Sequence, residues 1–344
     1  MVLYRKFEVF IIKVVTIRYN GSMNIPLMLA PMAELSHRAL RELIESFGGA
    51  DLYYTEMIAA GALTSGGQFE SFYTDGGPCP ERLVYQLCGG NGEQLARGAA
   101  LLGELPCAGI DINMGCCAPA ITRTGAGIRW MASADAACSM IAAVRKALHR
   151  GSNEQGLNGP RLSVKLRIGF GDDPEYLITF CRRLEAEGVD RITLHPRTAH
   201  EKFKRRARWE YVAGLQAALT IPVTGNGDIS GPEDLARRTA ECPGGVMTGR
   251  AAIRQPWIFA AARGLSQTID LEATGLYFLE LLERYQPPEF HISRARRFFN
   301  YFCDNLTWAH YVKTKLNRET TLKGIAECWS TYFCEQQEER FKHG

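Results

Sequence analysis

The residues of this chain best suited to chemistry lie at 109–119, in the stretch GIDINMGCCAP. An apolar, strand-like segment there runs directly into Cys116, on a turn bounded by glycine and proline. A thiol at such a position can do chemistry, because small residues at a strand end leave room for a ligand. Most free cysteines are simply small buried hydrophobic residues. A catalytic role for Cys116 is therefore supported only if chemically suitable groups lie at the other strand ends.

Further polar side chains are predicted at the carboxyl ends of neighbouring strands, where the active sites of α/β barrels form. Besides Cys116 they are Gln86, Asn113, Lys165, Arg167 and His195. If these amides, cations and the imidazole were buried only as packing, each would need a polar partner. We therefore expect them to converge on one mouth of a barrel.

Two glycine-rich loops are predicted after the seventh and eighth strands, at residues 224–229 and 247–252. In barrel enzymes this pair of loops often binds phosphate, because glycine lets backbone N–H groups approach the anion. Arg250 would add a positive charge. The expected ligand is a cofactor with one phosphate, and the residues alone do not separate a flavin from other phosphorylated ligands.

The elements that must position these groups alternate between short apolar runs and amphipathic helical segments, which is typical of βα units and a parallel sheet. The strand-like runs are 27–30, 52–55, 83–87, 109–113, 162–167, 191–194, 222–225 and 245–248. The helical segments between them are 37–46, 92–102, 134–149, 174–187, 209–217 and 232–239. Eight units over roughly 240 residues favour a closed (β/α)8 TIM barrel. No GxGxxG supports a Rossmann domain.

After about residue 263 the pattern becomes helical, with helices predicted at 271–285, 293–306 and 308–316 and a break at 286–288. We predict an N-terminal extension (1–23), a catalytic α/β barrel (24–263) and a C-terminal all-helical domain (264–344). An apolar run at 9–17 resembles a signal peptide, but Lys13 interrupts it and it is too short to span a membrane.

The helical region interleaves cations with aromatic residues, a pattern that can hold a phosphate backbone and stack bases. The residues are Arg294, Arg296, Arg297, Lys313, Lys315, Arg318 and Lys323 with Phe298, Phe299, Tyr301, Phe302, Trp308 and Tyr311. By itself such a stripe is better interpreted as a core with a solvated face. A second basic run follows the sixth strand and favours RNA, because it lies at the rim of the mouth. It contains Lys202, Lys204, Arg205, Arg206 and Arg208.

Composition limits the class of protein. The 344 residues are 46% hydrophobic and 22% charged, which predicts a folded chain with a large core and a smaller second unit. A net charge of +3 does not by itself indicate a nucleic-acid binder. The eleven cysteines lack CxxC or zinc-type spacing, so we expect reduced thiols, a cytoplasmic location and no metal. No membrane attachment or obligatory protein partner is indicated.

Eight ordered segments of the chain resemble the signature of tRNA-dihydrouridine synthases. They are APM at 30–32, YTEM at 54–57, QLCG at 86–89, DINMGC at 111–116, VKLR at 164–167, LHPRT at 194–198, GNGDI at 225–229 and TGR at 248–250. The resemblance covers about residues 27–259. It implies a barrel that carries FMN, a helical domain that binds tRNA, and reduction of a uridine with NADPH as the electron source.

The resemblance also implies roles for individual residues. Cys116 would be the proton donor. FMN would be bound by Pro31, Met32, Gln86, Lys165, His195, Asn226, Gly227, Asp228, Gly249 and Arg250. Asn113 would flank the uracil, and the residues expected to bind substrate are Asn113, Arg167, Lys204, Arg205 and Arg206.

The chemistry agrees with these roles. Uracil would receive a hydride at carbon 6 and a proton at carbon 5, so an acid is needed there. An ordinary thiol, with a pKa of about 8.5, is mostly protonated at neutral pH and can donate. The base must also leave its stack, at a cost of a few kcal/mol that phosphate contacts and stacking in the protein would offset.

Two departures from the family pattern lie in the cysteine loop. Cys117 stands where proline is usual, and Ala120 stands where the family often has lysine. We expect a less rigid loop and a weaker RNA contact there, with Arg123 as a possible replacement for the missing charge. Two alternatives remain open: a barrel flavoprotein acting on a free pyrimidine, of dihydroorotate or dihydropyrimidine type, and a non-catalytic RNA-binding protein on the same fold.

Overall fold

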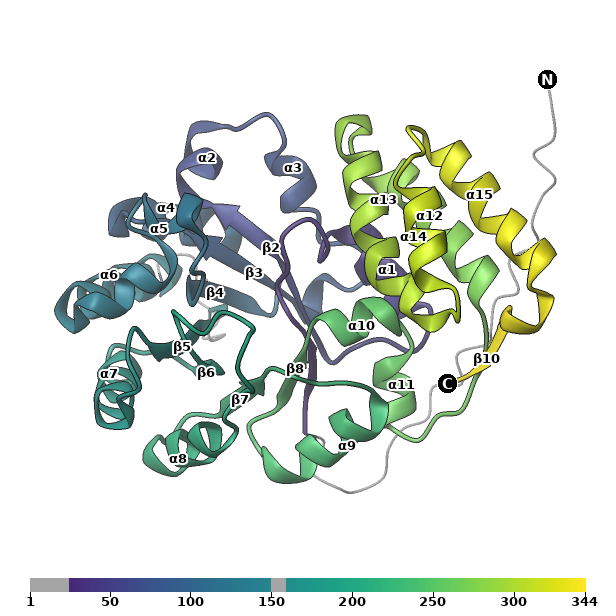
Figure 1. The fold of residues 1–344 in the computed structure, drawn as a ribbon. Coiled ribbons are helices and arrows are strands. Elements are labelled where there is room, and N and C mark those ends of the chain that lie inside the picture. Colours follow the sequence, from purple (N-terminus) through teal and green to yellow (C-terminus); the bar gives the residue numbers. More distant parts are fainter. Residues whose placement is uncertain (1–24, 150–158) are drawn as a thin grey trace.

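The computed structural model describes residues 25–149 and 159–344, so the expected extension at 1–23 lies outside the described residues. Eight parallel strands pair in sequence order, and the last pairs with the first, which closes the barrel (Figure 1). The strands are β1 (Leu27–Leu29), β2 (Leu52–Ala59), β3 (Leu83–Cys88), β4 (Gly109–Met114), β5 (Arg161–Gly169), β6 (Arg191–Thr198), β7 (Val223–Asn226) and β8 (Val246–Thr248). The predicted TIM barrel is confirmed, and each predicted run coincides with a strand.

Helices surround the barrel and bury their apolar faces against the outward-facing strand residues. They are α1 (Arg38–Glu45), α4 (Gly92–Gly103), α6 (Ala134–His149), α7 (Pro174–Ala186), α8 (Glu210–Ala218), α9 (Pro232–Glu241), α10 (Arg250–Arg254) and α11 (Ile258–Ala262). The start of α7 follows from local chemistry. Asp173 accepts a hydrogen bond from the backbone N–H of Tyr176, and Pro174 takes the first helical position.

Side chains alternate along each strand, and this alternation divides the barrel into an outer core and an inner layer. Along β4, Ile110 and Ile112 pack outward in the main core, whereas Asp111 points inward to polar partners. A separate apolar cluster inside the barrel forms a floor. Its buried members are Met28, Ala30, Tyr54, Val84 and Met247. The polar groups of the mouth lie beyond this floor.

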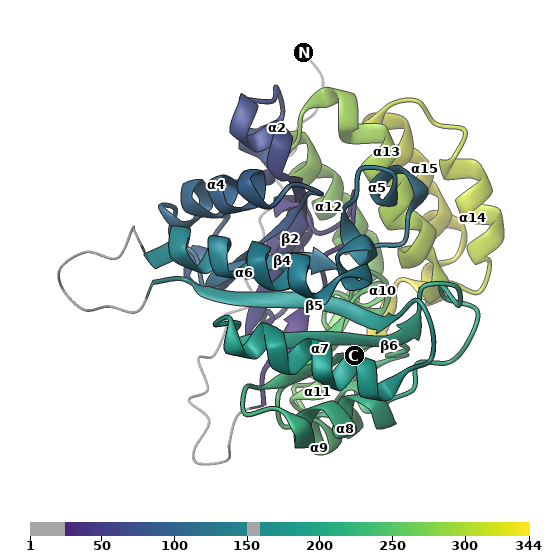
Figure 2. The same cartoon turned by 90° about the vertical axis from the view of Figure 1, so that its left-hand side faces the viewer.

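The mouth lies at the carboxyl ends of the strands, on the right in Figure 2. In that view the short helix α5 (Pro119–Thr122), which follows β4, lies on the same side as α13 (Pro288–Phe302) and α14 (Ala309–Leu316). Two further short helices, α2 (Ala60–Ser65) and α3 (Glu70–Tyr73), follow β2. The C-terminal helices therefore border the end of the barrel where chemistry was expected.

The C-terminal region contains α12 (Leu271–Tyr285), α13, α14 and α15 (Leu322–Glu335), packed on one side of the barrel beside α1 (Figure 1). The predicted helix at 293–306 begins earlier, because Pro288 suits the first helical position. The expectation of an all-helical region needs one correction. Strand β9 (Thr268–Asp270) pairs antiparallel with β10 (Phe341–His343). Strands this short carry no periodicity that a sequence pattern could reveal.

Three aromatic residues of α13, Phe298, Phe299 and Phe302, are buried in the core of this helical region, as the core interpretation of the stripe predicted, whereas Tyr301 is half-buried. Phe298 stacks on Phe278, with ring centroids 3.7 Å apart, and on Phe302 at 4.9 Å. Helices α12 and α15 approach closely at Gly275, where an added Cβ would lie 2.3 Å from Nε1 of the buried Trp329.

None of the helices within residues 25–149 and 159–344 is both long and apolar enough to cross a membrane. The eleven cysteines are free thiols.

Candidate active site

A chain of hydrogen bonds crosses the polar layer from β5 to β3 and β4. Asp111 accepts hydrogen bonds from Ser163 Oγ at 2.6 Å and from Gln86 Nε2 at 2.7 Å. Asn113 Nδ2 donates to Gln86 Oε1 at 3.0 Å. An ionised carboxylate only accepts, so Asp111 orients the amide of Gln86, and Gln86 in turn orients the amide of Asn113. Burial raises the pKa of Asp111 to about 6.

Asn113 in turn holds the loop that carries Cys116. Its Oδ1 accepts hydrogen bonds from the backbone N–H groups of Gly115 at 3.2 Å and Cys116 at 3.0 Å. The carbonyl of Cys116 accepts from the N–H of Ile128 at 3.0 Å. Gly127, with φ +64°, permits this approach, because an added Cβ would lie 2.4 Å from that carbonyl oxygen. The half-buried Cys116 is thus held by its backbone at the mouth.

The same loop is fixed from β5. Arg167 Nε donates to the carbonyl of Gly115 at 3.1 Å. Its Nη1 donates to the carbonyls of Thr198 at 3.2 Å and Lys202 at 3.0 Å. Arg167, expected to bind substrate, therefore also braces the loops after β4 and β6. These bonds hold the loop although cysteine replaces proline at position 117.

Lys165 lies in the inner layer beside this network. Burial and the neighbouring Arg167 lower its pKa to about 8, although Asp111 favours the charged form. No hydrogen bond or ion pair of its ammonium occurs within the described residues. A half-buried cation that has no partner within the described residues and lies at a barrel mouth is suited to a ligand that brings its own acceptor.

His195 is neutral. Burial and four nearby cations lower its pKa to about 2. Its Nε2 lies 2.9 Å from Nη1 of Arg197, and since the guanidinium only donates, Nε2 is the acceptor and the ring proton is on Nδ1. The imidazole therefore offers one N–H donor without adding charge.

Sequence reasoning missed the role of Arg197. Its Nη2 contacts both carboxylate oxygens of Asp228, at 2.6 and 2.7 Å, and Asp228 also accepts from the N–H of Ala207 at 2.7 Å. Burial raises the pKa of Asp228, but these hydrogen bonds outweigh it and hold the pKa below the ordinary value. Asp228, expected among the cofactor-binding residues, is thus committed to fixing the loop after β6.

The two glycine-rich loops approach the mouth closely. At Gly227, with φ +136°, an added Cβ would lie 3.2 Å from Cδ2 of His195. At Gly249 it would lie 3.0 Å from Sδ of Met32, near Pro31 at the end of β1.

Two neighbouring side chains complete this rim. Asn226 Nδ2 donates to the carbonyl of Met247 at 2.9 Å, which joins β7 to β8. Arg250 begins α10 and forms no ion pair within the described residues.

Phe203 is a second residue that sequence reasoning missed. Its side chain is 61% exposed, yet its ring lies 5.0 Å from the guanidinium of Arg250 and 5.5 Å from that of Arg167. The ring centroid of His195 is 5.8 Å away. The signal was a lone aromatic within the basic run KFKRR. An exposed ring among three mouth residues is placed to meet a planar ligand.

The basic run around Phe203 divides into two groups. Arg208 is bound by Asp172 and, at 2.9 Å, by Glu201. The second group consists of Lys202, Lys204, Arg205 and Arg206, which are exposed and form no ion pairs within the described residues. Only the second group has charge available for an external anion.

Helix α13 is joined to the rim by a buried ion pair. Arg294 Nη2 lies 3.2 Å from Glu56 on β2, and both side chains are almost fully buried. Glu56 also accepts from the backbone N–H of Glu34 at 2.6 Å, and Glu34 pairs with Arg297 at 3.1 Å. The mouth and the helical region therefore present adjoining surfaces.

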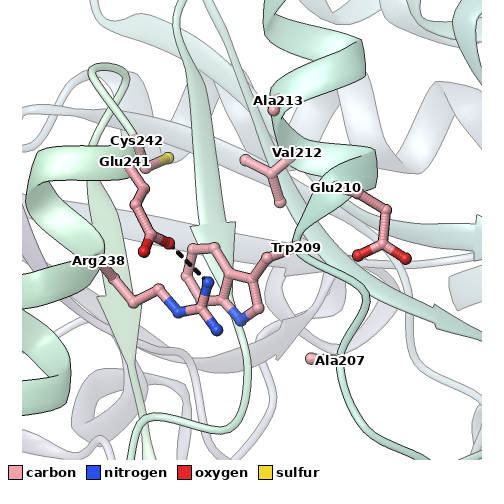
Figure 3. A pocket seen from close by; sticks show the side chains of 8 residues that line it. All are labelled: Ala207, Trp209, Glu210, Val212, Ala213, Arg238, Glu241 and Cys242. Atoms are coloured by element: carbon pink, nitrogen blue, oxygen red, sulfur yellow. Dashed lines mark hydrogen bonds and ion pairs between the residues drawn. The ribbon is translucent and has the colours of Figure 1, made fainter.

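A cavity of about 350 Å³ lies between α8 and α9. Figure 3 shows Arg238 beside the ring of Trp209, 4.4 Å from its centroid, with Glu241 accepting a hydrogen bond at 2.6 Å. None of the predicted site residues lines this cavity, so it is not part of the candidate active site.

Comparison with known proteins identifies the family of the chain. A family model described as "Dihydrouridine synthase (Dus)" matches residues 28–329. A probable tRNA-dihydrouridine synthase of Aquifex aeolicus is 33% identical over 67% of this chain and 71% of that protein. tRNA-dihydrouridine(16) synthase of Cupriavidus necator is 30% identical over 70% of this chain and 74% of that protein. tRNA-dihydrouridine synthase B of Pseudomonas aeruginosa is 28% identical over 90% of this chain and 93% of that protein.

Among solved structures, a 2-naphthoyl-CoA reductase complex aligns with a TM-score of 0.51 and 13% identity. The alignment covers 70% of this chain and 50% of that chain, and it is a likeness of fold alone.

Proposed function

Because the chain belongs to the dihydrouridine synthase family, we propose that it uses FMN and NADPH to reduce uridine in tRNA to 5,6-dihydrouridine. The observation that carries the proposal is the placement of Cys116, held by Asn113 at a barrel mouth that also contains Lys165 and a neutral His195. The reaction would take place in the cytoplasm, where thiols remain reduced.

The residues present fit FMN. The unpaired Arg250 and the glycine-rich loops after β7 and β8 suit its phosphate, and the half-buried Lys165 suits a polar edge of its ring. Further predicted contacts come from Pro31, Met32, Gln86, His195, Asn226, Gly227 and Gly249. When bound and reduced by NADPH, FMN supplies the hydride that uracil accepts at carbon 6.

The chain's own residues complete the reaction. Cys116 holds a proton on Sγ and donates it to carbon 5 of uracil. Negative charge that develops on the carbonyl at carbon 4 is stabilised by the cations of the same layer, Lys165 and Arg167. The backbone bonds to Asn113 keep the thiol in place, so no loop ordering is needed during the step.

RNA binding is assigned to the loop after β6. Lys204, Arg205 and Arg206 contact phosphates, and Phe203 stacks against the extruded base. The backbone of this loop is fixed by Arg167 and by the pair of Arg197 and Asp228, so its cations are presented in one arrangement.

The test compares Cys116→Ala with Cys117→Ala as a matched neighbour. Dihydrouridine is counted by mass after incubation of unmodified tRNA with NADPH. General acid catalysis contributes ~10²–10⁴-fold, so Cys116→Ala should lose product on that scale, with flavin reduction by NADPH almost intact. Cys117→Ala and Cys117→Pro should stay active. Near-normal product from Cys116→Ala with loss in Cys117→Ala would reverse the assignment.

The same assay separates the alternative functions. Reduction of free uridine as well as tRNA would favour a free-pyrimidine enzyme, and flavin-containing protein that modifies no tRNA would favour a non-catalytic RNA binder.

A further inference from the structure

Arg197 on β6 contacts several parts of the mouth although its own side chain is only 3% exposed. Its Nη1 lies 2.9 Å from Nε2 of His195, its Nε donates to the carbonyl of Arg205 at 2.5 Å, and its Nη2 donates to both carboxylate oxygens of Asp228. All three guanidinium nitrogens therefore have acceptors within the protein. Any effect of this residue on a ligand must act through these three neighbours.

The first neighbour is the imidazole that is expected to bind FMN. Because a guanidinium only donates, Arg197 keeps the proton of His195 off Nε2 and on Nδ1. No second hydrogen bond of this ring occurs in residues 25–149 and 159–344. An added Cβ at Gly227 would lie 3.2 Å from Cδ2 of His195, which shows that the backbone after β7 lies close against the ring. The Nδ1–H group is thus kept available to donate to a ligand in the mouth.

The other two neighbours belong to loops that contain strained backbone. Apart from glycine, three residues in the described part of the chain have positive φ angles, and two of them are Lys202 at +49° and Asp228 at +52°. Such conformations cost energy and persist where surrounding contacts hold them. Arg197 holds the carboxylate of Asp228, and the buried Arg167 holds the carbonyl of Lys202. Asp228 also accepts from the N–H of Ala207, so it ties the loop after β7 to the loop after β6.

We propose that Arg197 is a positioning residue that joins the cofactor side of the mouth to the loop after β6, residues 199–209, by fixing both the proton of His195 and the backbone that presents the basic side chains. This inference rests on the proposed function, which assigns FMN to His195 and RNA to that loop. One guanidinium holds both parts, so its loss should disturb cofactor and RNA binding together. A residue that only stabilised the fold would change neither affinity in the folded protein.

The first test determines the tautomer of His195 in the full chain by nitrogen NMR of labelled histidine, with His195→Gln to assign the signal. In wild type the proton should be on Nδ1. Arg197→Met should free Nε2 and give a mixture of tautomers. Arg197→Lys should do the same, because one ammonium lacks the planar fork that reaches several acceptors at once. Asp228→Asn should keep the wild-type tautomer, since the contact between Arg197 and His195 remains.

This readout needs neither FMN nor RNA, so it is independent of the proposed function. A wild-type proton on Nε2 overturns the proposal, and so does an unchanged tautomer in Arg197→Met. A wild-type tautomer in Arg197→Lys also overturns it, because charge alone would then be sufficient.

The second test measures the dissociation constants of FMN and of unmodified tRNA at several salt concentrations. Arg197→Met should weaken FMN binding about tenfold, as for one lost hydrogen bond. It should weaken tRNA binding by roughly two- to tenfold for each side chain that must then be ordered on binding. The salt slope should stay as in wild type because the exposed cations are retained, whereas a lost phosphate contact would lower it by roughly 0.7–0.9.

The matched control is Arg191→Met, at the opposite end of the same strand. Arg191 donates to Thr224 Oγ1 at 2.8 Å and to the carbonyl of Gly244. This variant should bind FMN and tRNA as wild type does, even where its melting temperature falls. Equal losses of affinity in Arg191→Met and Arg197→Met would reveal a structural effect alone and overturn the proposal.

The remaining outcomes separate positioning from direct contact. Wild-type affinities for both ligands in Arg197→Met overturn the proposal, and a lower salt slope overturns it in favour of a phosphate contact by Arg197 itself. A wild-type protein that makes no dihydrouridine, combined with the expected tautomer change and affinity losses in Arg197→Met, would reject the proposed reaction and keep the positioning role.

Discussion

At the scale of single residues, Asp111 decides how the proposed acid is held. Its carboxylate accepts from Gln86, which orients Asn113, and Asn113 binds the backbone N–H of Cys116. The carboxylate of Asp111 acts on the loop only through Gln86 and Asn113, so we assign it as a positioning residue. Its pKa of about 6 places its change of charge within an accessible pH range.

We predict that Asp111→Asn lowers the rate of dihydrouridine formation about tenfold or more, because misplacing a catalytic group can cost up to ~10²-fold. The wild-type rate should fall as pH drops through about 6, since protonated Asp111 no longer accepts from Gln86. The pKa of Asp111 is higher in the folded state than in the unfolded state, so protonation of this carboxyl stabilises the folded protein as the pH falls through about 6. The predicted fall in rate is therefore not caused by unfolding through Asp111.

The control for this prediction is Ser163→Ala, which retains the carboxylate but removes a hydrogen bond that lowers its pKa, so the fall in rate should move to higher pH. Identical pH profiles for wild type and Asp111→Asn would show that the carboxylate has no positioning role.

Lys165 should control flavin retention as a function of pH. Its ammonium is charged below a pKa of about 8 and neutral above it, so an anionic cofactor loses an attraction as pH rises through this value. Released flavin, followed by fluorescence, should increase above pH ~8 in wild type. Lys165→Met should release more flavin at neutral pH and show no such step. An equally large increase in released flavin above pH ~8 in Lys165→Met would show that a group other than Lys165 causes it.

At the scale of elements, the loop after β6 combines a fixed backbone with exposed cations. Arg167 donates to the carbonyl of Lys202 at 3.0 Å, and Arg197 Nε donates to the carbonyl of Arg205 at 2.5 Å. Between these points Phe203 and Lys204 extend outward. The element is therefore built before RNA arrives, which lowers the entropy lost on binding.

Replacing Lys204, Arg205 and Arg206 together by alanine should weaken tRNA binding and reduce its salt slope, because fewer counterions are released. Each lost phosphate contact lowers the slope by roughly 0.7–0.9. Flavin content should remain normal, since these side chains are exposed and the loop that carries them is held by hydrogen bonds to its backbone carbonyls. An unchanged salt slope, with tRNA still reduced, would place the RNA backbone elsewhere.

At the scale of the whole molecule, the pair of Arg294 and Glu56 joins the helical region to the barrel. The two groups lie 3.2 Å apart, and both side chains are almost fully buried. Removing one partner of a buried ion pair leaves an uncompensated charge and costs about 3–5 kcal/mol. The junction should therefore be sensitive to single substitutions.

Arg294→Met should lower the free energy of unfolding by that amount, whereas the double variant Arg294→Met with Glu56→Gln should recover part of the loss. Denaturant titrations of the wild type, both single variants and the double variant form the cycle. Single variants within about 0.5 kcal/mol of wild type would show that the pair does not stabilise the junction.

The barrel was predictable because its signals are local. Strands buried on both faces appear as short apolar runs, and six of the eight runs are followed by a segment with a helical period near 3.6. The convergence of Gln86, Asn113, Lys165 and His195 followed from strand order alone, since carboxyl ends of parallel strands share one end of the barrel. The resemblance added the chemistry that these groups would perform.

Pairing across the fold was not predictable in this way. The β9–β10 pair joins segments about seventy residues apart, and the ion pairs of Arg197 with Asp228 and of Arg294 with Glu56 join different elements. Local sequence encodes the periodicity of each element but not which charged groups meet.

By itself, therefore, the sequence determined the barrel, the end of the barrel at which its polar groups gather, and the family to which the chain belongs. Only the tertiary structure decided which polar groups are free for ligands. Asp228 forms an ion pair with Arg197, whereas Lys165 and Arg250 form no ion pairs within the described residues. The same stripe that buried Phe298 left Trp308 exposed, because burial depends on which helix faces meet in the packed molecule and not on residue type.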